Sequence, residues 1–160
     1  MRTLILCTLA LGSPAVSLDA TTAPLLDGRH VATYAQARGA FGRPARIVAT
    51  GGACAASWPR DGLEIRFAAT AGCAPASLGA WLRVTIGSTR WHTGRGLRVG
   101  ASLVQLHALY PDAARLPGTT LWRLETGGPL CDGGAPLALA AKPVSGRVGA
   151  LIVLHVPACG

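Results

Sequence analysis

The sequence predicts an α+β protein made of two tandem units, each a helix followed by antiparallel strands. Three observations predict this class: two short segments with helical periodicity, a spacing of 69 residues between them, and several runs in which apolar and polar residues alternate. The chain of 160 residues is long enough for one domain or two small repeats. Its 21 glycines and 11 prolines predict frequent turns, which argues against an all-helical bundle.

The N-terminus has the pattern of a secretory signal peptide: Arg2, then an apolar run over residues 4–12, then small residues over 13–17. The run is shorter than the roughly 20 apolar residues that cross a bilayer, and no later segment is apolar enough. We therefore expect a secreted mature chain without a transmembrane segment. Cleavage is predicted after Ser17, and two further small residues offer alternative sites, Ala20 and Ala23.

On these signals the chain divides into four ranges. They are a signal peptide at residues 1–17, a linker rich in Thr, Ala and Pro at 18–26, a first helix-plus-sheet unit at 27–93 and a second unit at 94–160.

The first helix is predicted within residues 31–41, where apolar side chains recur on one helical face. Thr33 or Asp27 would serve as its N-cap, because their side chains can accept a hydrogen bond from the first helical turn. Gly42-Arg43-Pro44 would end it, since glycine and proline interrupt helical hydrogen bonding.

The second helix is predicted from Leu103 to Tyr110, with Ser102 as its N-cap and Pro111 as its stop. Extended runs and a pair of cysteines follow each helix, so the 69-residue spacing indicates a duplicated unit. Chance similarity between two short amphipathic helices is the alternative. The shift superposes Thr33 on Ser102, Gln36 on Gln105 and Phe41 on Tyr110.

Strands are expected where apolar and polar residues alternate, since successive side chains of a strand point to opposite faces. In residues 63–67 the apolar side chains share one face, and Glu64 and Arg66 share the other. In residues 120–125 the pattern assigns two side chains inward, Trp122 and Leu124, and two outward, Arg123 and Glu125.

The run over residues 81–86 is the strand that matters most for function. Its alternation leaves Trp81 and Arg83 on the face opposite the core, and places three side chains in the core, Leu82, Val84 and Ile86. Residues 148–156 are apolar on both faces, which predicts a central strand beside a shorter one at 137–139.

Cysteine usage predicts disulfides. Cys7 would leave with the signal peptide, and the four that remain are Cys54, Cys73, Cys131 and Cys159. An even number in a small exported domain implies disulfide bonds. Of the three possible pairings we favour the local one, Cys54–Cys73 with Cys131–Cys159, in which each bond contributes roughly 3 kcal/mol. No C-x-x-C or H-x-x-x-H spacing occurs, so no metal site is expected.

No catalytic motif is complete. Gly100-Ala101-Ser102-Leu103-Val104 comes closest to a G-x-S-x-G elbow but ends in valine, and Ser102 is better placed as a helix cap than as a partner of His107. Glu64 and Glu125 alternate outward as surface charges, whereas a glycosidase needs two carboxylates facing each other. The sequence therefore predicts no enzyme activity and no cofactor. A small secreted hydrolase is kept as a third hypothesis.

The formal net charge is +8, and Lys142 is the only lysine among the basic residues. The arginines are spread along the chain rather than clustered, which argues against a nucleic-acid partner. A solvated surface explains this charge. The alternative is attraction to an anionic cell-envelope polymer or an acidic partner.

One segment carries a resemblance to known proteins. It is Gly96-Leu97-Arg98-Val99-Gly100-Ala101-Ser102-Leu103, followed by Leu106, Leu109, Tyr110 and Pro111, and Gly42-Arg43-Pro44 matches its exit in the first half. The pattern resembles tandem helix-plus-sheet proteins typified by secreted β-lactamase inhibitor proteins, and is similar to the single-copy fold of outer-membrane assembly lipoproteins of the BamE type. The resemblance covers about residues 27–159 and implies architecture more than inhibition of any enzyme.

The candidate binding site consists of four residues, Trp81, Arg83, Arg90 and Trp91. Tryptophan and arginine are enriched at binding hot spots because they offer large rigid area and hydrogen-bond donors. We therefore expect a secreted module that binds another extracellular protein without catalysis, with inhibition of an exported enzyme as one form of that role. A second layer covering this face is the structural alternative. Two other tryptophans, Trp58 and Trp122, are assigned to the core.

Overall fold

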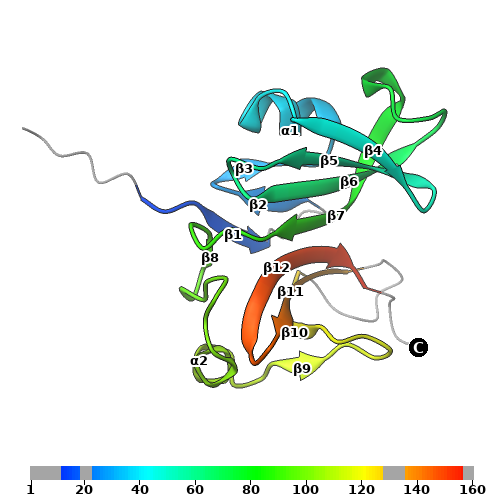
Figure 1. The fold of residues 1–160 in the computed structure, drawn as a ribbon. Coiled ribbons are helices and arrows are strands. Elements are labelled where there is room, and N and C mark those ends of the chain that lie inside the picture. The colour runs from blue at the N-terminus through cyan, green and yellow to red at the C-terminus, as the bar shows by residue number, and fades with distance from the viewer. Residues whose placement is uncertain (1–11, 19–22, 128–135, 157–160) are drawn as a thin grey trace, which may run out of the picture.

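The computed structural model describes residues 12–18, 23–127 and 136–156, which form two sheets and two helices (Figure 1). The eight strands of the larger sheet are, in order across it, β4 (Arg46–Thr50), β5 (Ala53–Trp58), β6 (Leu63–Ala69), β7 (Leu78–Ile86), β12 (Arg147–His155), β11 (Leu137–Val144), β10 (Trp122–Gly127) and β9 (Ala114–Arg115). The smaller sheet has the order β3 (Arg29–His30), β2 (Pro24–Leu26), β1 (Ala15–Leu18) and β8 (His92–Thr93). The helices are α1 (Tyr34–Phe41) and α2 (Leu103–Leu109), and a single 3-10 turn spans Pro75–Ser77.

The predicted α+β class is wrong, because strands make up 50% of the structure and helices only 14%. The two helices were correctly located, but they have only eight and seven residues. Twelve strands in two sheets make up most of the regular structure in the described residues, and this makes the protein mainly β. No helix in the described residues is long and apolar enough to cross a membrane.

The larger sheet has the same element order on both sides of its centre. Along the chain α1 is followed by β4 to β7, and α2 is followed by β9 to β12. β7 and β12 pair antiparallel at the middle, so the two sets extend outward in opposite directions, into the upper and lower halves of Figure 1. The bounds of β5 and β10 lie 69 residues apart, and so do those of β7 and β12.

Both helices begin at local capping signals. The Thr33 hydroxyl accepts a hydrogen bond from the Gln36 backbone nitrogen at 3.3 Å, and the Gln36 side chain accepts one from the Thr33 nitrogen at 3.1 Å. Ser102 Oγ accepts from the Gln105 nitrogen at 3.1 Å. Of the two N-caps considered for the first helix, Thr33 is therefore the one used, and the Ser102 prediction is confirmed.

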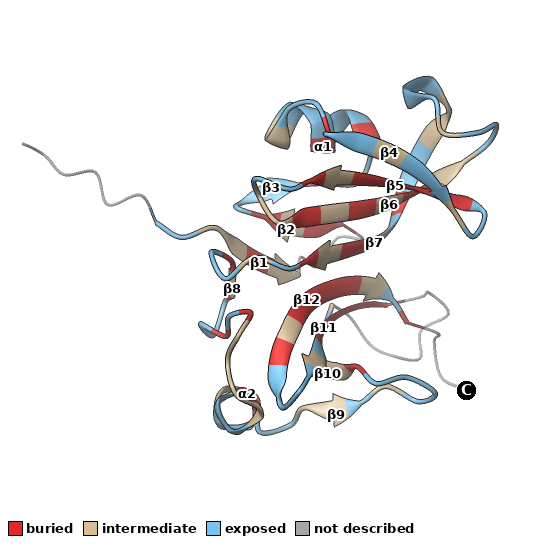
Figure 2. Cartoon of the chain, in the orientation of Figure 1, coloured by how far each residue is buried: buried red, intermediate tan, exposed pale blue. Residues whose placement is uncertain are grey.

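The main core lies between the larger sheet and the layer formed by the helices and the smaller sheet. We call the sheet face that carries Ile65, Phe67 and Val84 the inner face; these three side chains are fully buried. Val16 of β1 and Leu106 of α2 belong to the same buried cluster. Figure 2 shows buried residues alternating with partly exposed ones along β6, as expected for a strand with one face in the core.

A β-bulge in β7 overturns the predicted direction of Trp81. Pairing with β6 passes from Arg66↔Arg83 to Phe67↔Trp81, so Leu82 is an extra residue opposite nothing. Because side-chain direction has a period of two, one extra residue moves Trp81 onto the inner face beside Val84. Trp81 is 3% exposed, whereas Leu82, predicted to be in the core, is 42% exposed.

A second irregularity reverses Glu125. In β10 the pairing with β11 passes from Arg123↔Ala140 to Glu125↔Leu139, which leaves Leu124 as the extra residue. Glu125 was predicted to point outward, but its carboxylate accepts a hydrogen bond from the Tyr110 hydroxyl on the core side at 3.1 Å. The prediction that residues 148–156 form a central strand is confirmed, since β12 lies between β7 and β11.

Two predicted ranges at the N-terminus coincide with strands. β1 contains Ser17, after which cleavage was predicted, and β2 lies within the predicted linker at 18–26. Val16 and Leu26, which pair across these strands, are both fully buried. These ranges are therefore part of the folded structure described.

The disulfide Cys54–Cys73 is present, as predicted, with a Cα–Cα distance of 5.6 Å. It ties β5 to the segment between β6 and β7. Cys131 and Cys159 lie outside the described residues, so their pairing stays a prediction.

Candidate functional site

Two of the four predicted binding residues are core residues. Trp81 is 3% exposed and its ring stacks on that of His155, with centroids 4.7 Å apart. Trp91 is 2% exposed and its Nε1 donates a hydrogen bond to the Asp61 carbonyl oxygen at 2.7 Å. Neither indole can offer contact area to a partner, so the prediction that Trp81 and Trp91 are exposed binding residues is wrong. Trp58 is buried, as predicted, and Trp122 is partly buried.

The two arginines of the predicted site remain at the surface but in different surroundings. Arg90 lies in the loop after β7, where its Nη1 donates to the Arg60 carbonyl oxygen at 3.2 Å. Arg83 lies within β7, on the sheet face opposite the core. The four predicted residues therefore do not form one surface, and only Arg83 belongs to the face that we describe next.

We call the face opposite the inner face the outer face. Cross-strand pairing places eight side chains of β4 to β7 on it in two rows, Arg46–Ser57–Glu64–Thr85 and Val48–Ala55–Arg66–Arg83. The uncharged members have small side chains, except Val48, which is 40% exposed. This half of the outer face therefore has a charged, partly exposed centre, although Ala55 beside it is only 3% exposed.

Arg66 and Arg83 lie directly opposite each other at this centre. Like charges in directly paired positions repel, and a single carboxylate is nearby: Glu64 Oε1 lies 4.0 Å from Arg66 Nε. The Nε atoms of both arginines are buried and find no hydrogen-bond partner among the described residues. Burial, followed by the charge of Arg66, lowers the pKa of Arg83, and Glu64 partly offsets this.

A guanidinium group carries a positive charge in proteins at neutral pH. Two cations thus share one carboxylate, and the Arg66 side chain is 42% exposed. Such a pair can bind a carboxylate or another oxyanion through parallel N–H···O hydrogen bonds.

The outer face of the other half is apolar and covered. Ile152 and Ala140, which pair across β12 and β11, are fully buried. They pack with Leu121 and partly buried Leu116, both from the loop between β9 and β10. Thr85↔Ile152 and Arg83↔Leu154 are the pairs at which the polar half meets the apolar half. The polar, partly exposed part of the outer face is therefore confined to β4 to β7.

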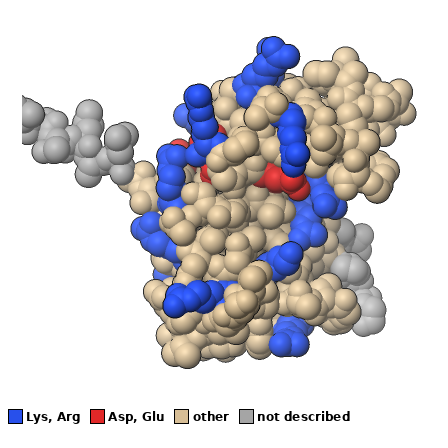
Figure 3. Space-filling model, in the orientation of Figure 1, with Lys and Arg blue, Asp and Glu red and all other residues tan. Residues whose placement is uncertain are grey.

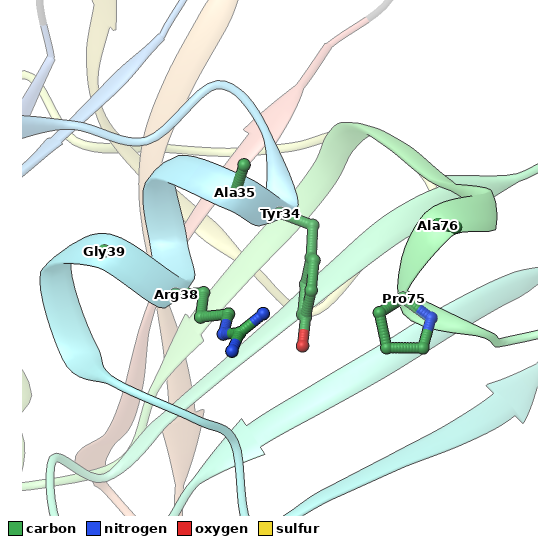
Figure 4. A pocket seen from close by; sticks show the side chains of 6 residues that line it. All are labelled: Tyr34, Ala35, Arg38, Gly39, Pro75 and Ala76. Carbon is green, nitrogen blue, oxygen red and sulfur yellow. The ribbon is translucent and has the colours of Figure 1, made fainter.

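A shallow pocket lies elsewhere, between α1 and the turn at Pro75–Ser77. Its volume is about 540 Å³. In Figure 4 the Tyr34 ring lies between the Arg38 side chain and Pro75. The rest of the lining is small: Ala35, Gly39 and Ala76. No carboxylate, histidine or cysteine is among these lining residues, so the pocket has no acid–base or nucleophilic group other than the phenol.

The groups considered for catalysis do not come together. Ser102 caps α2, while the His107 ring packs edge-on against Trp122 at 4.7 Å between centroids. Glu64 lies on the outer face and Glu125 on the inner side of the sheet. No group of three or more metal-binding side chains occurs within the described residues.

Arg66 was not among the predicted site residues, although the alternation over residues 63–67 correctly placed Arg66 and Glu64 away from the core. The missing information was the register between β6 and β7. Only this register brings Arg66 against Arg83, and a bulge within it determines which β7 side chains share the face.

Comparison with known proteins found no matching family model, no similar curated protein and no similar solved structure.

Proposed function

We propose that the protein is an exported, non-catalytic module that binds an acidic segment of another extracellular protein on the outer face of β4 to β7. The single observation that carries this proposal is the Arg66–Arg83 pair, in which two exposed-side cations share one carboxylate. Carboxylates of a partner would relieve the repulsion between the two guanidinium groups. Inhibition of an exported enzyme is one form that such binding would take.

The surroundings of the pair suit a protein partner. Val48 adds exposed apolar area in the same row, and arginine flanked by apolar area is typical of binding hot spots. Export is supported by the N-terminal pattern and by the Cys54–Cys73 disulfide, which suits an oxidising compartment.

The second candidate is binding of an anionic cell-envelope polymer. It is favoured by the net charge of +8 and by basic side chains that lie around much of the outline in Figure 3. Binding of that kind depends on total charge rather than on one pair, and it weakens steeply with salt. This difference separates the two candidates.

The test compares two double variants with the same loss of charge. Arg66→Gln with Arg83→Gln removes the pair, and Arg43→Gln with Arg98→Gln removes two exposed arginines elsewhere. Binding of a glutamate-rich peptide is measured by calorimetry at low and physiological salt. We expect the first variant to raise Kd at least tenfold and the second to change it less than threefold.

An equal loss in both variants would overturn the paired site and support the polymer-binding candidate. The same variants are then tested for retention on cell-wall material. Thermal unfolding serves as the control for folding: both variants should unfold within a few degrees of the parent protein, because surface substitutions away from the core usually change stability by less than about 0.5 kcal/mol.

A further inference from the structure

The pocket between α1 and the Pro75–Ser77 turn has two walls that are held in place by the fold. The Trp81 backbone nitrogen donates to the Ala32 carbonyl oxygen at 3.2 Å, which joins the start of α1 to the strand that follows the turn. The turn itself begins two positions after the disulfide-bonded Cys73. The pocket volume of about 540 Å³ lies within the range of roughly 300–1,000 Å³ that is usual for small-molecule sites.

Tyr34 is the buried member of this pocket. It is 7% exposed and its ring packs edge-on against Phe67 of the core, whereas the other five lining residues are exposed. The Tyr34 hydroxyl forms no hydrogen bond with any described residue, and it is not among the atoms that are sealed from solvent without a partner. The hydroxyl therefore opens into the pocket that the ring lines. Because burying a polar group without a hydrogen bond is unfavourable, this position favours a partner that accepts or donates there.

Arg38 supplies a second donor group beside this hydroxyl. It follows Tyr34 by four positions, so both side chains lie on the same face of α1, and Figure 4 shows them next to each other. A cation in the last turn of a helix often interacts with the terminal carbonyl groups, but here Arg29 Nη1 donates to the Ala40 carbonyl oxygen at 2.7 Å. The Arg38 side chain has no hydrogen bond or ion pair within the described part of the chain, and no acidic residue lines the pocket.

These groups match a carboxylate that is attached to a compact apolar body. A guanidinium group and a neighbouring hydroxyl can donate to the two oxygens of one carboxylate, and one positive charge balances its negative charge. The exposed side chains of Pro75 and Ala76 supply an apolar wall on the other side of Tyr34. We propose that this pocket binds a small apolar carboxylic acid, free or as the C-terminal residue of a peptide, through Arg38 and Tyr34.

This site is separate from the proposed binding surface. Tyr34 belongs to the core on the inner side of the larger sheet, and the arginine pair lies on the outer face. Each site can therefore be tested without the other.

The first test is an NMR titration of the backbone amides of the full chain with phenylacetate. We expect saturable shifts at residues 34–39 and 76–77. Phenylacetamide, which has the same body without the charge, should cause none. If phenylacetate gave no saturable shift at these residues, the pocket would hold water only and the proposal would be wrong. Shifts confined to Arg66 and Arg83 would also refute it, while supporting the arginine pair on the outer face.

Matched variants assign the two donor groups. Arg38→Gln should raise the Kd of phenylacetate about tenfold or more, since it removes a hydrogen bond between charged groups. Arg98→Gln removes an exposed arginine from the other half of the chain and should change Kd less than about twofold. Tyr34→Phe keeps the ring against Phe67 and removes only the hydroxyl, so it should raise Kd about fivefold or more.

Equal losses in Arg38→Gln and Arg98→Gln would mean that overall charge attracts the ligand, which would overturn the site. An unchanged Kd in Tyr34→Phe would overturn it as well. Thermal unfolding of each variant, compared with the parent protein, shows that a change in Kd does not arise from loss of the fold.

Two N-acetylated neutral peptides that end in phenylalanine distinguish the sources of the carboxylate. One has a free C-terminal carboxylate and the other is amidated. Tighter binding of the free peptide than of phenylacetate assigns the pocket to peptide ends, and weaker binding assigns it to small free acids. An amidated peptide that bound as tightly as the free one would refute recognition of a carboxylate.

Discussion

Tyr110 forms the most deeply placed polar network in the described part of the chain. Its side chain is 2% exposed, its hydroxyl donates to Glu125 Oε1 at 3.1 Å and it shares a 2.6 Å hydrogen bond with the hydroxyl of Thr93. Thr93 is fully buried and also accepts from the Leu97 nitrogen at 3.1 Å. The network thus joins α2, β8 and β10.

This network predicts a loss of stability at high pH. Burial, opposed by the Thr93 hydrogen bond and increased by the Glu125 carboxylate, raises the pKa of Tyr110 to about 12, from 10.0. The folded state keeps its proton where the unfolded chain has lost it. This contribution to stability is therefore complete below pH 10 and disappears as the pH rises towards 12.

The measurement is the free energy of unfolding in urea at pH 8, 10 and 11.5 for the parent protein and for Tyr110→Phe. At pH 8 the variant should be less stable by about 1 kcal/mol, the typical value of a lost hydrogen bond. Between pH 10 and 11.5 the parent should lose more stability than the variant. Parallel curves would show that Tyr110 does not titrate late.

Side-chain hydrogen bonds differ in how well they can be predicted from the sequence. The caps at Thr33 and Ser102 depend on residues three positions apart, so the sequence alone located them. The Tyr110–Glu125 contact depends on the bulge at Leu124, which turns Glu125 towards the core. A strict alternation assigned that carboxylate to the opposite face.

At the scale of elements, the same cause explains the main error in the predicted site. The predicted alternation of inward and outward side chains holds from Arg83 to Ile86. It fails before Arg83, because Leu82 is an extra residue without a partner in β6. A bulge has no distinct signature in one sequence, and it exchanges the faces of the residues before it as far as the next irregularity, here a second register shift between Phe67 and Ala69 of β6. Trp81 thus entered the core while Arg83 kept its predicted outward position.

The disulfide is the element-scale feature for which we predict a measurable effect. Cys54 and Cys73 are separated by 19 positions, and closing a loop of this size should contribute about 3 kcal/mol by restricting the unfolded chain. Cys54→Ser with Cys73→Ser should lower the free energy of unfolding by about this amount. Urea unfolding of the oxidised proteins measures the difference, and a change below about 1 kcal/mol would contradict it.

Peptide mapping without reduction examines both bonds in the same preparation. β11 and β12 pair up to Leu137↔His155, and the Val156 nitrogen donates to the Pro136 carbonyl oxygen at 3.0 Å. In the sequence, Cys131 lies a few positions before Pro136 and Cys159 a few positions after Val156. We therefore expect a Cys131–Cys159 peptide, and a bond of either residue to Cys54 or Cys73 would contradict the predicted pairing.

At the scale of the molecule, the order of the strands in the sheet was harder to predict from the sequence than their positions along the chain. The 69-residue spacing and most extended runs were visible in the sequence, but nothing in it placed β7 against β12. Their pairing, with Val84 opposite Val153, turns the two halves into one eight-stranded sheet. It also determines where the polar half of the outer face ends and the apolar half begins.

This junction predicts that the two halves unfold together. Val84 and Val153 are both fully buried and belong to one core cluster that contains residues from each half. Val153→Ala at the junction should lower the free energy of unfolding by about 2 kcal/mol, since it leaves a cavity between the halves. The transition should shift without broadening into two.

Far-UV circular dichroism and tryptophan fluorescence provide independent probes of this cooperativity. Three tryptophans lie in the first half and Trp122 in the second, so a Trp122→Phe background reports on the first half alone. Coincident midpoints in both probes, before and after Val153→Ala, are the expected result. Different midpoints in fluorescence and circular dichroism would show that the two halves unfold independently and that the shared core does not couple them.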